Sequence, residues 1–211
     1  MMTKPSPWPV VHSERQALAD DLSTLDEAQW ATPSLCDHWS VHQALGHMVA
    51  TNKITPAGFF TGLAKNGFRF ESMSANSIAA ETSGSPAQTL ASFRERVKAT
   101  THPPGPSDTM LGETIVHAED IRRPLGIAHA YPVDAVTRVA DFYASSNLMI
   151  GGKKRIAGLR LRADDADWSH GEGPEVSGPA LSLLMAISGR KAVLTDLSGP
   201  GVDTLRSRMP A

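Results

Sequence analysis

The sequence is poor in the features that mark several protein classes. Among its 211 residues there is a single cysteine, Cys36, so the chain forms no internal disulfide bond and no cysteine-based zinc ribbon. No apolar run approaches the roughly 18 residues of a membrane span, and the first residues lack the apolar core of a secretory signal. Lys and Arg number 20 against 22 Asp and Glu, a net charge of −2, which provides no basic field for nucleic acid. We therefore expect a cytoplasmic protein without a nucleic-acid or membrane partner.

Several familiar catalytic motifs are also missing. The chain has no glycine-rich phosphate loop, no H-E-x-x-H zinc motif and no G-x-S-x-G nucleophile elbow. These absences argue against the common nucleotide-binding, metalloprotease and serine-hydrolase sites. The eight histidines are then the residue type most worth tracing along the chain.

What the sequence does contain is a series of helical segments. Two capping boxes, Ser40-x-x-Gln43 and Ser85-Pro-x-Gln88, each predict a helix start, because both side chains bond free N–H groups there. Apolar spacing of about 3.6 residues predicts helices at about 10–25, from 41 toward 54, from 86 toward 97, from 108 to the stop at Pro124, and at 133–149. For residues 58–84 we predict a helical extension followed by a mobile loop.

The pattern changes after residue 150. Residues 159–163 alternate like a strand, 171–176 predict a second strand or bulge, and 193–197 a third strand. Two helices are predicted between and after them, at 179–188 and 202–208. We therefore expect a mainly α protein, with a helical bundle over residues 1–150 and a small α/β domain over 151–211.

The helix predicted from residue 108 carries the strongest indication of chemistry. At about 100° per residue, Glu113, His117 and Asp120 fall on the same side as its apolar residues. Three charged residues are predicted to point away from that side: Glu119, Arg122 and Arg123. Burying unpaired carboxylates and an imidazole is costly, and a divalent ion removes the cost by binding them directly. Because Glu113 and His117 are four residues apart, they can converge on one ion. The alternative is a layer of salt bridges to arginines of neighbouring helices.

A third ligand has to come from another helix, because a catalytic zinc usually has three protein ligands and one open position. His47, at the margin of the apolar side of its helix, is one candidate, and His42 and His12 compete with it. Spacing alone does not choose among them. Three further residues are expected to serve in packing: Trp30, Cys36 and Trp39.

These segments resemble the DinB-like metalloenzyme superfamily, and more narrowly the actinobacterial family of mycothiol-dependent maleylpyruvate isomerase. Residues 30–47, WATPSLCDHWSVHQALGH, are similar to a family motif that ends in a metal-binding histidine. Residues 113–126, ETIVHAEDIRRPLG, are similar to the helix that supplies two more ligands. Residues 168–179, 187–190 and 197–201 resemble the family's C-terminal domain. The resemblance covers nearly the whole chain.

The resemblance implies an up-down-up-down four-helix bundle in which His47, Glu113 and His117 bind a divalent metal. Zinc is the first expectation, with nickel and cobalt as alternatives. It further implies Arg190 as a catalytic residue that binds substrate carboxylates, for which a guanidinium fork is suited. Asp120 is a candidate to orient a ligand histidine from behind.

The resemblance also implies a thiol cosubstrate, mycothiol, at the open metal position. Zinc lowers the pKa of a bound thiol, and the thiolate would attack a small electrophile in an isomerisation or an S-transfer. The segment after residue 151 is short, so the maleylpyruvate specificity itself is not carried over. We expect an enzyme, monomeric or homodimeric. The alternatives are a non-catalytic metal-containing binding or stress protein of the same fold, and a metal-assisted hydrolase, which needs a general base.

Overall fold

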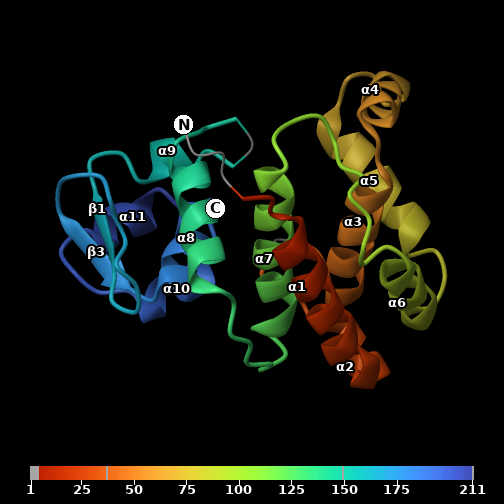
Figure 1. Ribbon diagram of the computed structural model, residues 1–211, viewed down its shortest axis with the longest axis horizontal. Coiled ribbons are helices and arrows are strands. Elements are labelled where there is room, and N and C mark those ends of the chain that lie inside the picture. Colours follow the sequence, from red (N-terminus) through yellow and green to blue (C-terminus); the bar gives the residue numbers. More distant parts are fainter. Residues whose placement is uncertain (1–4, 37, 149, 211) are drawn as a thin grey trace. The chain divides into compact units, whose positions relative to one another are not determined.

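The computed structural model describes residues 5–36, 38–148 and 150–210, which form two compact units, Met1–His129 and Ala130–Ala211 (Figure 1). It is mainly helical with one small three-stranded sheet, as predicted. The division falls near residue 130, whereas the change of sequence pattern had placed it at 150. The difference arises because helix α8 (Val133–Ala144) packs on α10 (Ala180–Ile187) and so belongs to the second unit.

The first unit is a helical bundle with α3 at its centre. Its helices are α1 (Trp8–Asp21), α2 (Glu27–Ala31), α3 (Val41–Lys53), α4 (Pro56–Lys65), α5 (Phe70–Glu81), α6 (Pro86–Glu95) and α7 (Asp108–Arg122), with a 3-10 turn η1 (Leu22–Thr24). Helix α3 packs against α5, α6 and α7, and α1 packs against α6 and α7. Apolar side chains such as Leu18, Val49 and Ile115 are fully buried between them.

Both predicted capping boxes are present. The Ser40 hydroxyl accepts from the Gln43 N–H at 3.2 Å, and the Gln43 side chain accepts from the Ser40 N–H at 3.0 Å. Ser85 and Gln88 form the same pair at the start of α6. These caps satisfy N–H groups that have no partner within the helix, and they fix where α3 and α6 begin.

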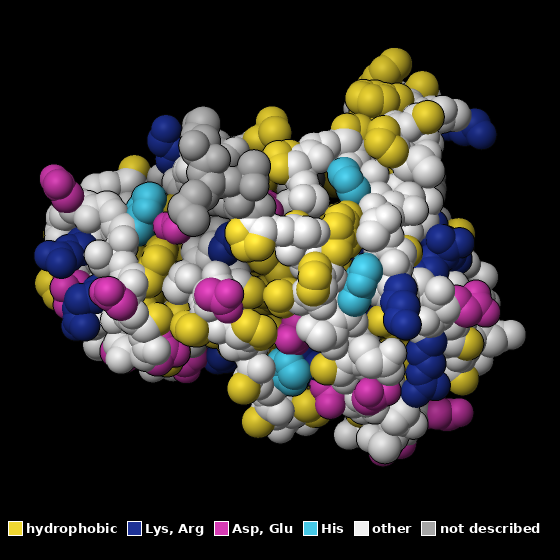
Figure 2. Space-filling view, viewed as in Figure 1, with side chains coloured by type: hydrophobic (Ala, Val, Ile, Leu, Met, Phe, Trp, Pro, Cys, Tyr) yellow, Lys and Arg dark blue, Asp and Glu magenta, His cyan; other side chains and the backbone are white. Residues whose placement is uncertain are grey.

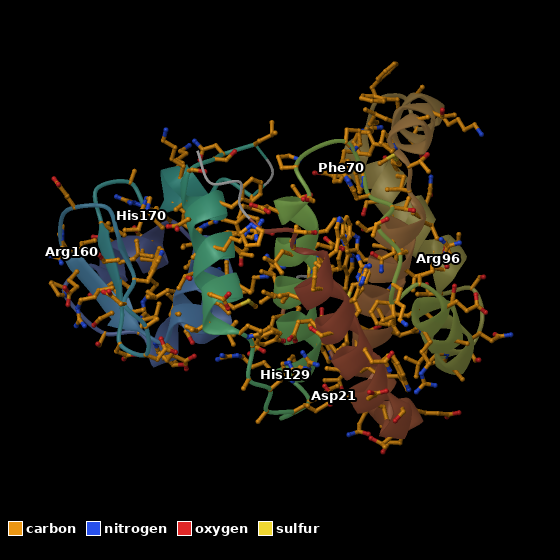
Figure 3. The ribbon with its side chains drawn as sticks, viewed as in Figure 1. Asp21, Phe70, Arg96, His129, Arg160 and His170 are labelled. Carbon is orange, nitrogen blue, oxygen red and sulfur yellow. The ribbon has the colours of Figure 1, made fainter. Side chains whose placement is uncertain are left out.

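The loop predicted within residues 58–84 is wrong, because that segment forms α4 and α5. Helix α5 buries only Met73 and Ile78, so its apolar period is too weak to read from sequence. It packs on α3 through small residues: a Cβ added at Gly46 would lie 2.5 Å from the Thr82 Cγ2 atom. Helix α4 buries no residue, and Figure 2 shows hydrophobic side chains gathered over it. Phe70, at the start of α5, is labelled in Figure 3.

The prediction that the charged residues of α7 point away from the core is wrong for Arg122 and Glu119, which are buried. Arg122 Nε donates to Asp21 Oδ2 at 2.7 Å, at the end of α1 where Figure 3 labels Asp21. Glu119 accepts from Arg123 Nε at 2.9 Å. Because α7 packs against both α1 and α3, more than one side of it is covered, and a single apolar stripe underestimates its burial.

The second unit packs α8 and α10 beside a small sheet. Its other elements are α9 (Gly152–Arg155), β1 (Arg160–Ala163), β2 (Ser169–His170), β3 (Glu175–Gly178), a 3-10 helix η2 (Lys191–Asp196) and α11 (Val202–Ser207). The strand order is β2-β1-β3, with β1 antiparallel to β2 and parallel to β3. The strand predicted at 193–197 is wrong: η2 occupies most of it, burying Val193 and Leu194. Among the described residues of both units, no helix is long and apolar enough to cross a membrane.

Candidate metal centre

The structure brings His47, Glu113 and His117 together inside the first unit. His47 Nε2 lies 3.2 Å from Glu113 Oε1, and His117 Nε2 lies 3.4 Å from Glu113 Oε2. One ligand atom from each residue lies within 4.8 Å of the others. Two ligands of a tetrahedral zinc, each about 2.1 Å from the ion, are about 3.4 Å apart. The spacing of these three side chains therefore fits a divalent ion between them.

The hydrogen bonding of Glu113 also fits an ion. Glu113 Oε1 is buried and, although His47 Nε2 lies 3.2 Å away, makes no well-aligned hydrogen bond within the described residues, which is unfavourable for a carboxylate oxygen. The side chains of His47, Glu113 and His117 are 17, 16 and 13% exposed. The cluster is therefore largely enclosed by protein, with a small part of each side chain exposed.

The charges of the cluster depend strongly on one another. Burial alone would raise the pKa of Glu113, but the adjacent imidazoles of His47 and His117 outweigh burial and hold that pKa well below its usual range. Burial alone would lower the pKa of His117, but Glu113 and Asp120 outweigh it and raise that pKa to about 9. Without an ion, a proton on His117 thus takes the place of the positive charge that a metal would bring.

Asp120 contacts His117 on the side away from Glu113, where an orienting carboxylate is expected. Asp120 is fully buried, and its Oδ2 atom lies 2.9 Å from His117 Nδ1. A carboxylate at this position favours a proton on Nδ1, which leaves Nε2 free to bind a metal. Helix α7 thus carries two possible ligand side chains and a carboxylate that contacts one of them.

Comparison with known proteins places this arrangement in a family. The family model of the mycothiol maleylpyruvate isomerase N-terminal domain matches residues 11–122, more than half of the chain and all three clustered side chains. The chain belongs to this family. No match is found among curated proteins.

Two solved structures of a mycothiol-dependent maleylpyruvate isomerase share the fold. The crystal structure of that enzyme has a TM-score of 0.59 and is 16% identical, covering 95% of this chain and 96% of that chain. A histidine-to-alanine mutant of it has a TM-score of 0.57 with the same identity and coverage. At this identity the likeness shows the fold alone.

In this isomerase-family chain, Trp39 forms a wall of the cluster, a role that the sequence analysis missed by assigning it to packing. Its ring centroid lies 4.8 Å from that of His47 and 6.2 Å from that of His117. The segment that carries Trp39 is attached to α7, because the Leu35 N–H donates to the Asp120 carbonyl oxygen at 3.0 Å. Trp30, by contrast, is buried in packing as expected.

The two competing histidines lie elsewhere. His42 Nε2 is 2.9 Å from Thr89 Oγ1, and burial lowers the pKa of His42. His12 stacks beside Trp8, with ring centroids 5.9 Å apart. Neither is in a group of possible metal ligands within the described part of the chain. A second such group joins Cys36 to His117 and Asp120, so the Cys36 side chain lies beside the cluster.

Arg190, the predicted substrate-binding residue, belongs to the second unit. Its Nη1 atom donates to the Ser188 carbonyl oxygen at 3.0 Å, just beyond the end of α10. It lies near Arg155: burial first, and then the charge of Arg190, lower the pKa of Arg155. Its role in binding a substrate carboxylate stays a prediction.

Proposed function

We propose that this chain is a metal- and mycothiol-dependent enzyme that isomerises a small electrophile or transfers a thiol to it. The observation that carries the proposal is the convergence of His47, Glu113 and His117 on one partly exposed point. Family membership supports the proposal, because the structurally similar isomerase is described as mycothiol-dependent.

The number of converging side chains favours catalysis over a structural site. Within the described residues, the cluster around Glu113 contains three possible ligands and no fourth. A structural zinc is usually closed by four protein ligands, whereas a catalytic zinc keeps a position open. The hydrolase alternative has less support, because Glu119 is paired with Arg123 and is not among the clustered groups.

His47, Glu113 and His117 would hold a divalent ion, with zinc as the first candidate. When bound, such an ion lowers the pKa of a thiol so that the thiolate is available at neutral pH. Glu113 stays ionised and contributes the negative charge of the ligand set. Asp120 holds the proton at His117 Nδ1, and Trp39 shields one side of the cluster from water. For Arg190 we propose the binding of a substrate carboxylate.

Metal analysis of purified protein, followed by titration of a cobalt-substituted sample with mycothiol, tests the proposal. We expect one equivalent of metal in the wild type, none in His117→Ala, and unchanged helicity by circular dichroism. His42→Ala is the matched control, because it removes a part-buried histidine outside the cluster and should retain the metal. A thiol-to-cobalt absorption band is expected on adding mycothiol.

The outcomes separate the parts of the proposal. Full metal retention in His117→Ala would overturn the ligand set. Metal binding without any spectral response to mycothiol would overturn the thiol-dependent function and favour a structural metal. A panel of small electrophiles, assayed by loss of free thiol, then distinguishes S-transfer from isomerisation, which returns the thiol.

A further inference from the structure

Two arginines of the first unit are fully buried, and among the described residues only one of them has an ion pair. Arg15, on α1, is fully buried, as is Arg122 on α7. Arg122 has the carboxylate of Asp21 at 2.7 Å. Among the described residues, no carboxylate lies within 4.0 Å of Arg15. Burying a guanidinium without a counter-charge is costly, so the environment of Arg15 requires an explanation.

The partners of Arg15 are neutral. Its Nη1 atom donates to the Ala99 carbonyl oxygen at 2.9 Å, and its Nη2 atom donates to Asn52 Oδ1 at 2.5 Å. Two further donors remain: Arg15 Nε and Asn52 Nδ2 are both buried, with no hydrogen-bond partner among the described residues. Arg15 and Asn52 are 0 and 1% exposed, so both donors lie in the interior of the bundle.

The electrostatics agree with this geometry. Burial lowers the pKa of Arg15 to about 10, and the negative charge that opposes the shift is that of Glu113. The carboxylate of Glu113 is already engaged with His47 and His117. Arg15 therefore retains a positive charge that is only partly compensated in the interior of the bundle.

This charge lies close to the candidate metal centre. Asn52 follows His47 by five residues on α3, about 7.5 Å along the helix axis and about 140° around it. Glu113, which attracts Arg15, is one of the clustered side chains. A small molecule with an anionic end at Arg15 could therefore have its other end near the cluster.

We propose that Arg15 and Asn52 form an anion site that binds a carboxylate group. The Nε–H of Arg15 and the Nδ2–H of Asn52 are the two donors that such a group would accept from, and its charge would neutralise the guanidinium. The anion site does not depend on a metal or a thiol. The further step, that the electrophilic substrate itself carries this carboxylate, rests on the proposed function.

Asn52→Asp tests the proposal most directly, because it places a carboxylate where the neutral amide now contacts Arg15. If Arg15 lacks a counter-charge, this substitution supplies one, and we expect the melting temperature to rise by about 3 °C or more. The same variant should no longer bind an added carboxylate. The conservative control is Asn76→Asp, which makes the same change in an exposed asparagine on α5.

The probe is 13C-labelled acetate, followed by NMR titration of chelator-treated, metal-free protein, with acetamide as the neutral control. We expect saturable acetate binding in the wild type and in Asn76→Asp. Binding should be at least tenfold weaker in Asn52→Asp and in Arg15→Met. Asn52→Leu provides a further test in case Arg15→Met does not fold, and should also weaken acetate binding.

Two results would overturn the proposal: no acetate binding to the metal-free wild type, or equal binding by the wild type and Asn52→Asp. A fall in the melting temperature of Asn52→Asp, with acetate binding unchanged, would show that Glu113 already neutralises Arg15. Because the titrations use metal-free protein, failure of the metal- and thiol-dependent function leaves their outcome unaffected.

Discussion

Asp120→Asn tests whether a buried carboxylate orients a metal ligand in this bundle. The change keeps the size of the side chain and removes its charge. Asp120 Oδ2 lies 2.9 Å from His117 Nδ1 and the residue is fully buried, so no water molecule from bulk solvent readily takes over the contact. The main-chain bond from Leu35 to the Asp120 carbonyl oxygen is retained in the variant.

The expected loss of metal affinity follows from the two roles of the Asp120 Oδ2 atom. It fixes the proton of His117 on Nδ1, and its charge makes Nε2 a better electron donor to a metal. Removing such a group typically lowers metal affinity about 10- to 100-fold, which corresponds to about 1.4–2.7 kcal/mol. An asparagine can also present its NH2 group to Nδ1, which would favour the tautomer that blocks Nε2.

The assay is a competition titration of zinc against a chromophoric chelator at constant pH. Asp203→Asn is the matched control, because the Asp203 side chain is 97% exposed and lies in the second unit. Equal zinc affinity in Asp120→Asn and the wild type, with thermal unfolding unchanged, would refute the idea that this carboxylate serves the metal. A lower melting temperature with unchanged zinc affinity would give Asp120 a structural role only.

Four further predictions concern the candidate centre, the packing of α3 on α5 and Arg190. Zinc affinity should rise with pH up to about 9, because the metal must displace the proton that His117 holds below its raised pKa of about 9; zinc titrations between pH 6 and 9 check this, and a flat profile would contradict it. In metal-free protein, the interactions of protonated His117 stabilise the fold; their contribution is fully present below pH 6.5 and is lost as the pH rises through about 9. Urea unfolding should therefore become easier as the pH rises across this window, and less so in His117→Gln. Gly46→Ala should destabilise the bundle by about 1–3 kcal/mol, because its Cβ would lie 2.5 Å from Thr82 Cγ2, and Thr82→Ser should restore part of the loss in denaturant titrations. Arg190→Lys should raise the KM of a carboxylate substrate more than it lowers kcat, since a lysine keeps the charge and loses the planar fork; equal KM values would argue against substrate contact.

The parts of the site that lie on one helix were predictable from sequence. Glu113, His117 and Asp120 are spaced by four and three residues, so the helical period alone places them together. The beginnings of α3 and α6 were equally predictable, because each capping box is formed by a serine and a glutamine only three positions apart.

Features that depend on distant segments were not predictable in this way. His42 and His47 are both on α3, and the choice between them depends on Thr89, which bonds His42 from α6. Helix α5 packs on α3, and its end at Thr82 lies close to Gly46. In each case the deciding contact joins residues more than 30 positions apart, which no local period records. The resemblance to a family supplied His47 where spacing could not.

Asp120 links the two parts of the candidate centre that come from different segments. Its side chain orients His117, while its carbonyl oxygen accepts from Leu35 in the segment that carries Trp39. Trp39 in turn lies against both histidines of the cluster. A shift of α7 at this point would therefore move a ligand and the aromatic wall together. Asp120→Asn should separate the two effects, because it changes the side chain that contacts His117 and retains the main-chain carbonyl that holds the segment of Trp39.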